Sequence, residues 1–210
     1  MTTQSEDRNM LLLFTRYPRA GETKTRLIPV LGEQGAAYLQ RTMSEKTFAM
    51  ARKLSGRRKI SLQVHYTGGS KLEMQQWLNG KITCIQQVGG SLGDRLIHAF
   101  RAAFAGRMSK VIAIGTDCPA LTPEIIENGF QNLADYDLVL GPALDGGYYL
   151  IGLKTEEPAL FSQIPWGMDQ VLNQTLKRAE MLGLSVHLLE PLADVDRPED
   201  LCHIATIQRM

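Results

Sequence analysis

Short apolar runs alternate with longer stretches of helical spacing along most of the chain. The runs are rich in β-branched residues, and between them apolar residues recur every three or four positions, as on one face of a helix. Leu92, Leu96, Ile97, Phe100 and Phe104 show this spacing clearly. The predicted strands are 11–15, 60–66, 82–86, 111–115, 138–140, 148–153 and 185–189. The predicted helices are 33–54, 71–78, 92–104 and 168–182. Two further helices are predicted from their first residues: one opens with Thr122 and Pro123, and the last follows the capping-box spacing from Asp196 to Glu199.

This alternation is typical of an α/β protein with a mostly parallel sheet. The run 111–115 is continuously apolar, as expected for a strand that helices cover on both faces. We find no internal repeat, low-complexity linker or break in composition. The sequence therefore predicts a single domain over 10–210, preceded by a polar, disordered tail over 1–9.

Composition narrows the classes of protein further. The 23 Lys+Arg and 22 Asp+Glu residues give a net charge of +1, which argues against a polybasic nucleic-acid-binding protein. Three widely spaced cysteines without a C-x-x-C motif indicate reduced thiols rather than disulfides or a zinc site. No stretch approaches the roughly 18–20 apolar residues of a membrane span. We therefore expect a cytoplasmic protein.

Ligands of such sheets bind at the carboxyl ends of the strands. The loop after the first strand carries four cations and one acid between Arg16 and Arg26. Gly21 allows close approach of the backbone to a ligand, and Lys24 and Arg26 can neutralise phosphate oxygens. The loop lacks the G-x-x-x-x-G-K spacing of a Walker A motif. It is either a phosphate-binding loop, which its position favours, or a solvated basic loop.

Two aspartate motifs are candidates for binding a metal. Asp117 follows the buried strand 111–115 and stands between glycine and proline, where one carboxylate plus substrate phosphates suits Mg²⁺ or Mn²⁺. Its alternative role is to cap the following turn. Asp194 and Asp196, two positions apart in an extended segment, project to the same side and could reach a metal together. Their alternative is Asp196 as a helix N-cap with Asp194 in solvent.

The segment 141–150 contains an Asp-Gly-Gly-Tyr motif. Asp145, Gly146 and Gly147 suit a plain hairpin turn. With Tyr148, they also suit a pocket for a sugar or another hydroxylated ligand. Trp166 is either an aromatic wall or a core residue, and its apolar surroundings in the sequence slightly favour the core.

Taken together, four segments resemble a bacterial family of small glycosyltransferase-like proteins of the GT-A type, related to the molybdenum-cofactor and phospholactate guanylyltransferases. They are 14–27, Gly115-Thr116-Asp117-Cys118-Pro119, 141–150, and Asp194-Val195-Asp196-x-Pro-Glu-Asp-Leu, in that order over nearly the whole chain. The resemblance implies a Rossmann-like, three-layer nucleotide-diphospho-sugar transferase fold.

The resemblance also implies roles for individual residues. Arg16, Gly21, Lys24 and Arg26 would bind the nucleotide phosphates, and Asp117 and Asp196 would bind Mg²⁺ or Mn²⁺. Asp145, Gly146, Gly147 and Tyr148 would face the acceptor or sugar, with Asp145 and Lys24 as the catalytic residues. The GT-A glycosyltransferases have an Asp-x-Asp motif where this chain has Asp117-Cys118-Pro119. The single aspartate is closer to the nucleotidyltransferases.

We therefore expect a metal-dependent transferase that uses a nucleoside triphosphate or a nucleotide sugar and a small acceptor. The transferred group is either nucleotidyl or glycosyl. The alternative is a non-catalytic protein that binds or senses a nucleotide on the same fold. A homodimer is one form of assembly that the sequence allows.

Overall fold

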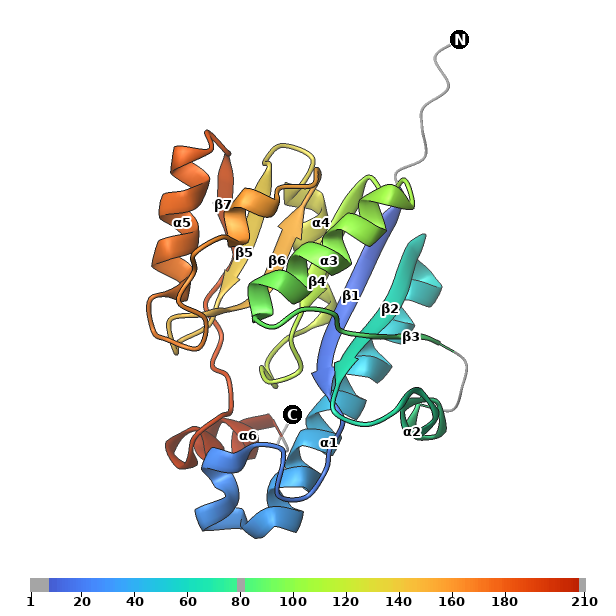
Figure 1. The fold of residues 1–210 in the computed structure, drawn as a ribbon, viewed down its shortest axis with the longest axis vertical. Coiled ribbons are helices and arrows are strands. Elements are labelled where there is room, and N and C mark those ends of the chain that lie inside the picture. The colour runs from blue at the N-terminus through green and yellow to red at the C-terminus, as the bar shows by residue number, and fades with distance from the viewer. Residues whose placement is uncertain (1–7, 79–81, 208–210) are drawn as a thin grey trace.

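The structure, a computed structural model, describes residues 8–78 and 82–207, without the side chains of 205–207. Seven strands form one sheet in the order β3-β2-β1-β4-β6-β5-β7 (Figure 1). The strands are β1 (Asn9–Arg16), β2 (Ile60–Thr67), β3 (Thr83–Gln86), β4 (Lys110–Ile114), β5 (Leu138–Pro142), β6 (Tyr148–Leu153) and β7 (Val186–Leu188). The helices are α1 (Ile28–Arg57), α2 (Lys71–Trp77), α3 (Leu92–Ala105), α4 (Pro123–Asn132), α5 (Val171–Met181) and α6 (Cys202–Ile207), with short 3₁₀ helices η1 (Thr25–Leu27), η2 (Pro158–Phe161) and η3 (Pro198–Leu201).

Most neighbouring strands run parallel, as predicted. β1 pairs in parallel with both β2 and β4, and β5 pairs in parallel with β7. Among the strands within the described residues only β6 is reversed, and it lies antiparallel between β4 and β5. The reversal places the start of β6, at Tyr148, at the edge of the sheet where β4 and β5 end. The loops after β1, β4 and β5 therefore share one edge with Tyr148.

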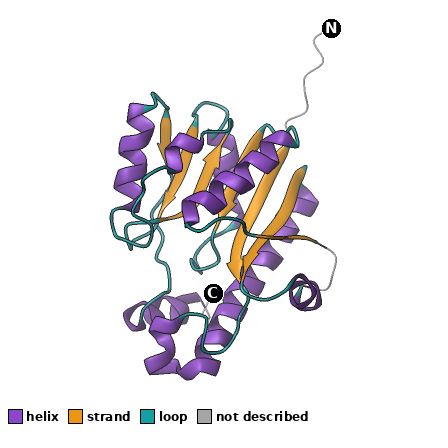
Figure 2. Ribbon diagram, in the orientation of Figure 1, coloured by secondary structure: helices purple, strands orange, loops and turns teal. Residues whose placement is uncertain are grey.

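Helices cover both faces of the sheet and make a three-layer fold (Figures 1 and 2). Alternation along β1 sends Leu11 and Leu13 into the core beneath α1 and α4, and Met10 and Leu12 into the core beneath α3 and α5. All four side chains are at most 5% exposed. No helix within the described residues is long and apolar enough to cross a membrane.

The predicted boundaries shift at several elements. Asn9, predicted to belong to the tail, begins β1, because its backbone pairs with Ile60 and Lys110 whatever the polarity of its side chain. Residues 1–7 of that tail lie outside the described residues. The first helix starts at Ile28 rather than at 33, with a break at Gly32, whose φ of 69° lies outside the helical region. The helix predicted over 168–182 is shorter, at Val171–Met181.

The capping box predicted from Asp196 to Glu199 is wrong. The carboxylate that reaches back belongs to Asp200, and its Oδ2 accepts the backbone N–H groups of Asp196 at 3.0 Å and of Arg197 at 2.7 Å. The N-cap of this 3₁₀ helix is Arg197, one residue after the predicted position, so the carboxylate three positions further on is that of Asp200. The side chain of Asp196 therefore does not cap this helix. At α4 the predicted cap is confirmed, because Thr122 Oγ1 accepts the N–H of Ile125.

Candidate functional site

A cavity of about 470 Å³ opens at the carboxyl edge of the sheet. Its walls come from the end of β1, the loop after β4, the hairpin between β5 and β6, and the 194–196 segment. The predicted site residues that line it are Arg16, Lys24, Asp117, Asp145, Gly147, Tyr148 and Asp196. The fold thus brings together residues that lie up to 180 positions apart, from Arg16 to Asp196.

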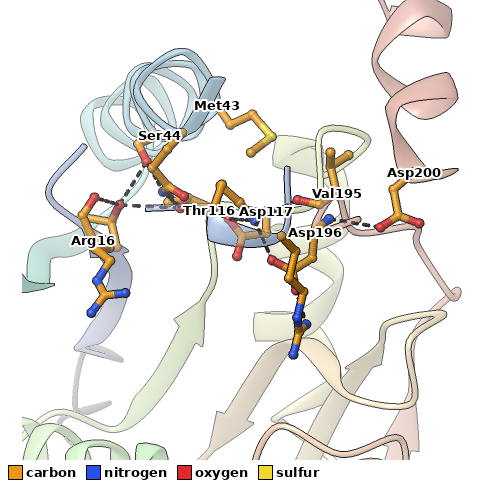
Figure 3. Close-up of polar contacts among 12 residues, drawn as sticks. Arg16, Met43, Ser44, Thr116, Asp117, Val195, Asp196 and Asp200 are labelled. Carbon is orange, nitrogen blue, oxygen red and sulfur yellow. Dashed lines mark hydrogen bonds and ion pairs between the residues drawn. The ribbon is translucent and has the colours of Figure 1, made fainter. Parts of the chain in front are cut away.

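Lys24 is the most buried of these charged groups, with 4% of its side chain exposed. Its Nζ lies 3.0 Å from Asp117 Oδ1 and 3.6 Å from Asp196 Oδ1, and it donates a hydrogen bond of 2.7 Å to the carbonyl oxygen of Val195. We call this set of three oxygens, from Asp117, Val195 and Asp196, the oxygen cage. Figure 3 shows Asp117, Val195 and Asp196 converging from the β4 loop and the C-terminal segment.

The loop after β1 directs Lys24 inward through its backbone. Lys24 has a φ of 49°, in the left-handed region, and its carbonyl accepts the N–H of Leu27 to start η1. Just before it, Thr23 Oγ1 donates to the carbonyl of Tyr17 at 3.2 Å. Gly21, with a φ of +78°, supplies a conformation that other residues rarely adopt. The glycine therefore shapes the loop, and it does not line the cavity.

The two sides of the oxygen cage are tied together by backbone. The N–H of Val195 donates to the carbonyl of Asp117 at 2.9 Å, so the C-terminal segment pairs with the loop after β4. Asp196 is also ion-paired through Oδ2 with Nη1 of Arg26, which is itself exposed. Arg26 thus approaches the site through Asp196 rather than by lining the cavity.

A buried polar cluster supports the loop after β4 from below. Thr116 Oγ1 lies 3.3 Å from Ser44 Oγ and 3.4 Å from Thr15 Oγ1, and Gln40 Nε2 donates to both Ser44 and Thr116 (Figure 3). All four side chains belong to residues that are at most 7% exposed. Because buried hydrogen bonds fix side-chain positions, this cluster holds the residue before Asp117. This cluster was not predicted from the sequence. The signal for it was the presence of two polar residues, Gln40 and Ser44, on the buried face of α1.

Asp194 also lines the cavity, although the resemblance assigns it no role. Its pKa is raised to about 6, mainly because the carboxyl group is half-buried and next because of the negative charge of Asp145. The signal for Asp194 was its spacing of two from Asp196. The alternative that placed it in solvent is therefore wrong.

The hairpin between β5 and β6 positions Asp145 beside the C-terminal segment, because the N–H of Leu144 donates to the carbonyl of Leu192 at 3.0 Å. Asp145 Oδ1 accepts the N–H of Gly147 at 2.8 Å, which is the turn predicted for an Asp-Gly-Gly sequence. Gly146, with a φ of +89°, lies so close to the backbone of Asp169 that a Cβ would clash there. Gly146 itself does not line the cavity. Asp145 is exposed and faces the same cavity as Lys24.

Tyr148 and Trp166 form an aromatic wall beside Asp145. Their rings meet edge to face, with centroids 6.3 Å apart. Gly93 at the start of α3 makes room for this wall, because a Cβ there would lie 2.6 Å from Trp166 Nε1. Trp166 packs against the core and also lines the cavity, so both interpretations of this residue hold.

The oxygen cage has the donor chemistry of a site for a hard cation. Its members are two carboxylates and a carbonyl, and Mg²⁺ binds few protein carboxylates, completing its shell with water and substrate phosphates. The cage surrounds a positive charge, that of Lys24, so the residues present fit a cation. Across the described part of the chain there is no cluster of three His, Cys, Asp or Glu side chains suited to a metal, so the two carboxylates of the cage would leave most of a metal's shell to water and phosphate oxygens.

Comparison with known proteins places this chain among its relatives. Residues 50–168, more than half of the chain, match the family described as uncharacterized proteins conserved in bacteria, DUF2064. The chain belongs to the DUF2064 family. The matched segment of this DUF2064 protein includes Asp117, Asp145 and Trp166.

Named relatives agree with the expected class. The DUF2064 protein is 35% identical over 97 residues to the 2-phospho-L-lactate guanylyltransferase of Methanopyrus kandleri, a match that covers 45% of this chain and spans about half, 49%, of that relative. A provisionally assigned nucleotide-diphospho-sugar transferase from Desulfovibrio desulfuricans G20 is 32% identical, with a TM-score of 0.88 over 94% of this chain and 86% of its own. A Mycobacterium tuberculosis H37Rv protein solved with manganese is 15% identical, with a TM-score of 0.55 over 93% and 97% of the two chains.

These likenesses confirm the predicted relation to the phospholactate guanylyltransferases and the predicted nucleotide-diphospho-sugar transferase fold. They also agree with the expected enzyme class, a transferase. The roles of individual residues, the acceptor, the homodimer and the location in the cell stay predictions.

Proposed function

We propose that this DUF2064 protein is a metal-dependent nucleotidyltransferase that takes a nucleoside triphosphate and transfers the nucleotidyl group to a small acceptor. The observation that carries the proposal is the meeting of Lys24, Asp117 and Asp196 at the carboxyl ends of β1 and β4, with Arg16 lining the same cavity. Cations beside carboxylates at this edge are what a metal–triphosphate complex requires. The guanylyltransferase relative supports the same class of reaction.

Each charged group has a task in this reaction. Asp117 and Asp196 would hold Mg²⁺ or Mn²⁺, which when bound neutralises charge on the phosphate oxygens and supports the departure of pyrophosphate. Lys24, Arg16 and Arg26 bind and orient the phosphates. In the in-line displacement an acceptor oxygen forms a bond to the α-phosphorus while the bond to pyrophosphate breaks.

The hairpin side of the cavity binds the acceptor. Asp145 orients a hydroxyl group of the acceptor, and the aromatic wall of Tyr148 and Trp166 packs against its apolar part. Gly147 contributes backbone to the same surface. The hydrogen bond from Gly147 to Asp145 leaves the other carboxylate oxygen of Asp145 for the acceptor.

Glycosyl transfer from a nucleotide sugar is the second candidate. It is favoured by the nearly full-length likeness to the assigned nucleotide-diphospho-sugar transferase. In that reaction Asp145 would take the proton of the attacking acceptor hydroxyl.

Thermal melting followed by product analysis tests the proposal. The four nucleoside triphosphates and a set of nucleotide sugars are each added with and without Mn²⁺, and 2-phospho-L-lactate serves as the first trial acceptor. A ligand at about 100 times its Kd stabilises the folded state by roughly 2.7 kcal/mol. We expect the largest shift with a triphosphate and Mn²⁺ together, and release of pyrophosphate once an acceptor is present.

Each other result has a meaning. Release of a nucleoside diphosphate from a nucleotide sugar would establish glycosyl transfer instead. Binding without turnover over a broad acceptor set would favour the sensing protein. No shift with any nucleotide would remove the proposal.

A further inference from the structure

Lys24 differs from the other cations of its loop. Arg16, Arg19 and Arg26 are exposed, whereas the Lys24 side chain is 4% exposed and its ammonium group lies inside the oxygen cage. The three oxygens lie 2.7, 3.0 and 3.6 Å from Nζ. Lys24, which is expected to bind phosphate, is therefore ion-paired with Asp117 and Asp196, the two carboxylates expected to bind the metal.

The same oxygens cannot serve both cations. A divalent cation bound by Asp117 and Asp196 would stand within a few ångströms of the ammonium group, and like charges at that separation repel strongly in a partly buried site. The backbone that carries the cage does not depend on the lysine, because the N–H of Val195 donates to the carbonyl of Asp117 and ties the two segments together. The two segments therefore stay paired if Lys24 leaves.

We propose that Lys24 is an internal counter-ion of the cage. The cage binds a divalent cation tightly only when the phosphates of a nucleotide bind the ammonium group of Lys24 in place of the carboxylates. This inference rests on the proposed function, because the phosphates are those of the nucleotide. On binding, the carboxylates exchange an ammonium group for the metal, and the ammonium group exchanges carboxylate oxygens for phosphate oxygens. No covalent bond changes.

This exchange couples the two ligands. Metal alone competes with Lys24, so it binds weakly, while nucleotide removes the competitor and strengthens metal binding. By linkage the metal strengthens nucleotide binding by the same factor. The preferred ligand is therefore the complex of a divalent cation with a nucleoside triphosphate, rather than either one first.

Mn²⁺ binding measured by electron paramagnetic resonance tests this without turnover. Wild type, Lys24→Met and Lys24→Arg are titrated with Mn²⁺, alone and with an α,β-methylene analogue of GTP, which cannot react at the α-phosphorus. Lys53→Met, an exposed lysine of α1 outside the cavity lining, is the matched control. Thermal melting establishes that each variant is folded, and Lys24→Gln replaces Lys24→Met if the latter is not.

We expect Lys24→Met to bind Mn²⁺ alone about tenfold more tightly than wild type, within the usual range of coupling between sites. The gain in Mn²⁺ affinity that the analogue produces should shrink in this variant. Lys24→Arg and Lys53→Met should resemble wild type.

The failures are distinguishable. If wild type binds Mn²⁺ with the analogue but Lys24→Met binds Mn²⁺ alone no more tightly, the counter-ion role is overturned and the proposed function stands. If wild type binds Mn²⁺ neither alone nor with any nucleotide, the proposed function fails and takes this inference with it.

Discussion

The two ends of the cavity are held in place by different forces. At the oxygen cage, charged groups from distant segments pair directly, with Lys24 3.0 Å from Asp117. At the aromatic wall, glycines set the shape: Gly93 admits Trp166, and Gly146 packs on the backbone of Asp169. The first end is sensitive to the charge of its ligands and the second to their shape, which suits a phosphate-bearing ligand at one end and an acceptor at the other.

The largest effect is expected from a substitution in the oxygen cage, the charged end of the cavity. Asp117→Asn keeps the size of the side chain but removes one negative charge from the oxygen cage. We expect turnover to fall by about 10³-fold, the scale of losing one electrostatic contact to a transition state. Nucleotide binding should also lose its response to Mn²⁺ in calorimetric titrations. The exposed Asp135→Asn is the control, and an Asp117→Asn enzyme that still responds to Mn²⁺ would contradict the assignment.

The next largest effect is on stability, and it comes from His65 in the core beneath the cavity. His65 is 3% exposed and its ring stacks on Phe14, which lines the cavity. Burial lowers the pKa of His65 to about 4, against an ordinary value near 6.5. Between these pH values the unfolded chain binds a proton that the folded chain does not, so stability is complete above pH 6.5 and is lost as the pH falls toward 4.

The expected loss in the free energy of unfolding is about 3 kcal/mol over that interval. Urea unfolding at a series of pH values measures it, and His65→Gln, which does not titrate, should show a flatter profile. Equal slopes for wild type and variant would show that His65 is not responsible.

Asp145→Asn tests the hairpin side of the cavity, where the acceptor is proposed to bind. Asparagine keeps an oxygen for the N–H of Gly147, so the turn, the melting temperature and the nucleotide affinity should stay near wild type. We expect turnover to fall by about 10²-fold, toward 10⁴-fold if the side chain takes a proton from the acceptor. Normal turnover would reduce Asp145 to a turn residue, and lost nucleotide binding would show that the two ends are not separate.

Arg26→Ala is expected to have the smallest effect. Arg26 is exposed and touches the cage only through Asp196, and exposed ion pairs contribute little to stability. We expect the melting temperature without ligand to be unchanged, and nucleotide affinity to fall by roughly fivefold with a weaker dependence on salt. Titrations at two salt concentrations measure both, and unchanged affinity would return Arg26 to the solvated surface.

Positions that depend on local pattern could be predicted. The apolar run before Asp117, the Asp-Gly-Gly turn at Asp145 and the cap at Thr122 each follow from a few neighbouring residues, and each occurs in the structure. The capping box at Asp196 failed because the helix begins one residue later, with Arg197 as its N-cap and Asp200 as the capping carboxylate. The polar cluster around Thr116 was not predicted, because its members come from β1, α1 and the loop after β4.

The sequence by itself determined the order of strands and helices, the mostly parallel sheet and the carboxyl edge where the candidate site lies, since hydrophobic period and turn chemistry act over short distances. Only the tertiary structure decided that the ammonium group of Lys24 lies between Asp117 and Asp196 and that Trp166 faces the cavity. Which charge meets which depends on the folding of segments up to 172 positions apart, from Lys24 to Asp196. Such pairing follows from the packing of the whole chain, which no local pattern encodes.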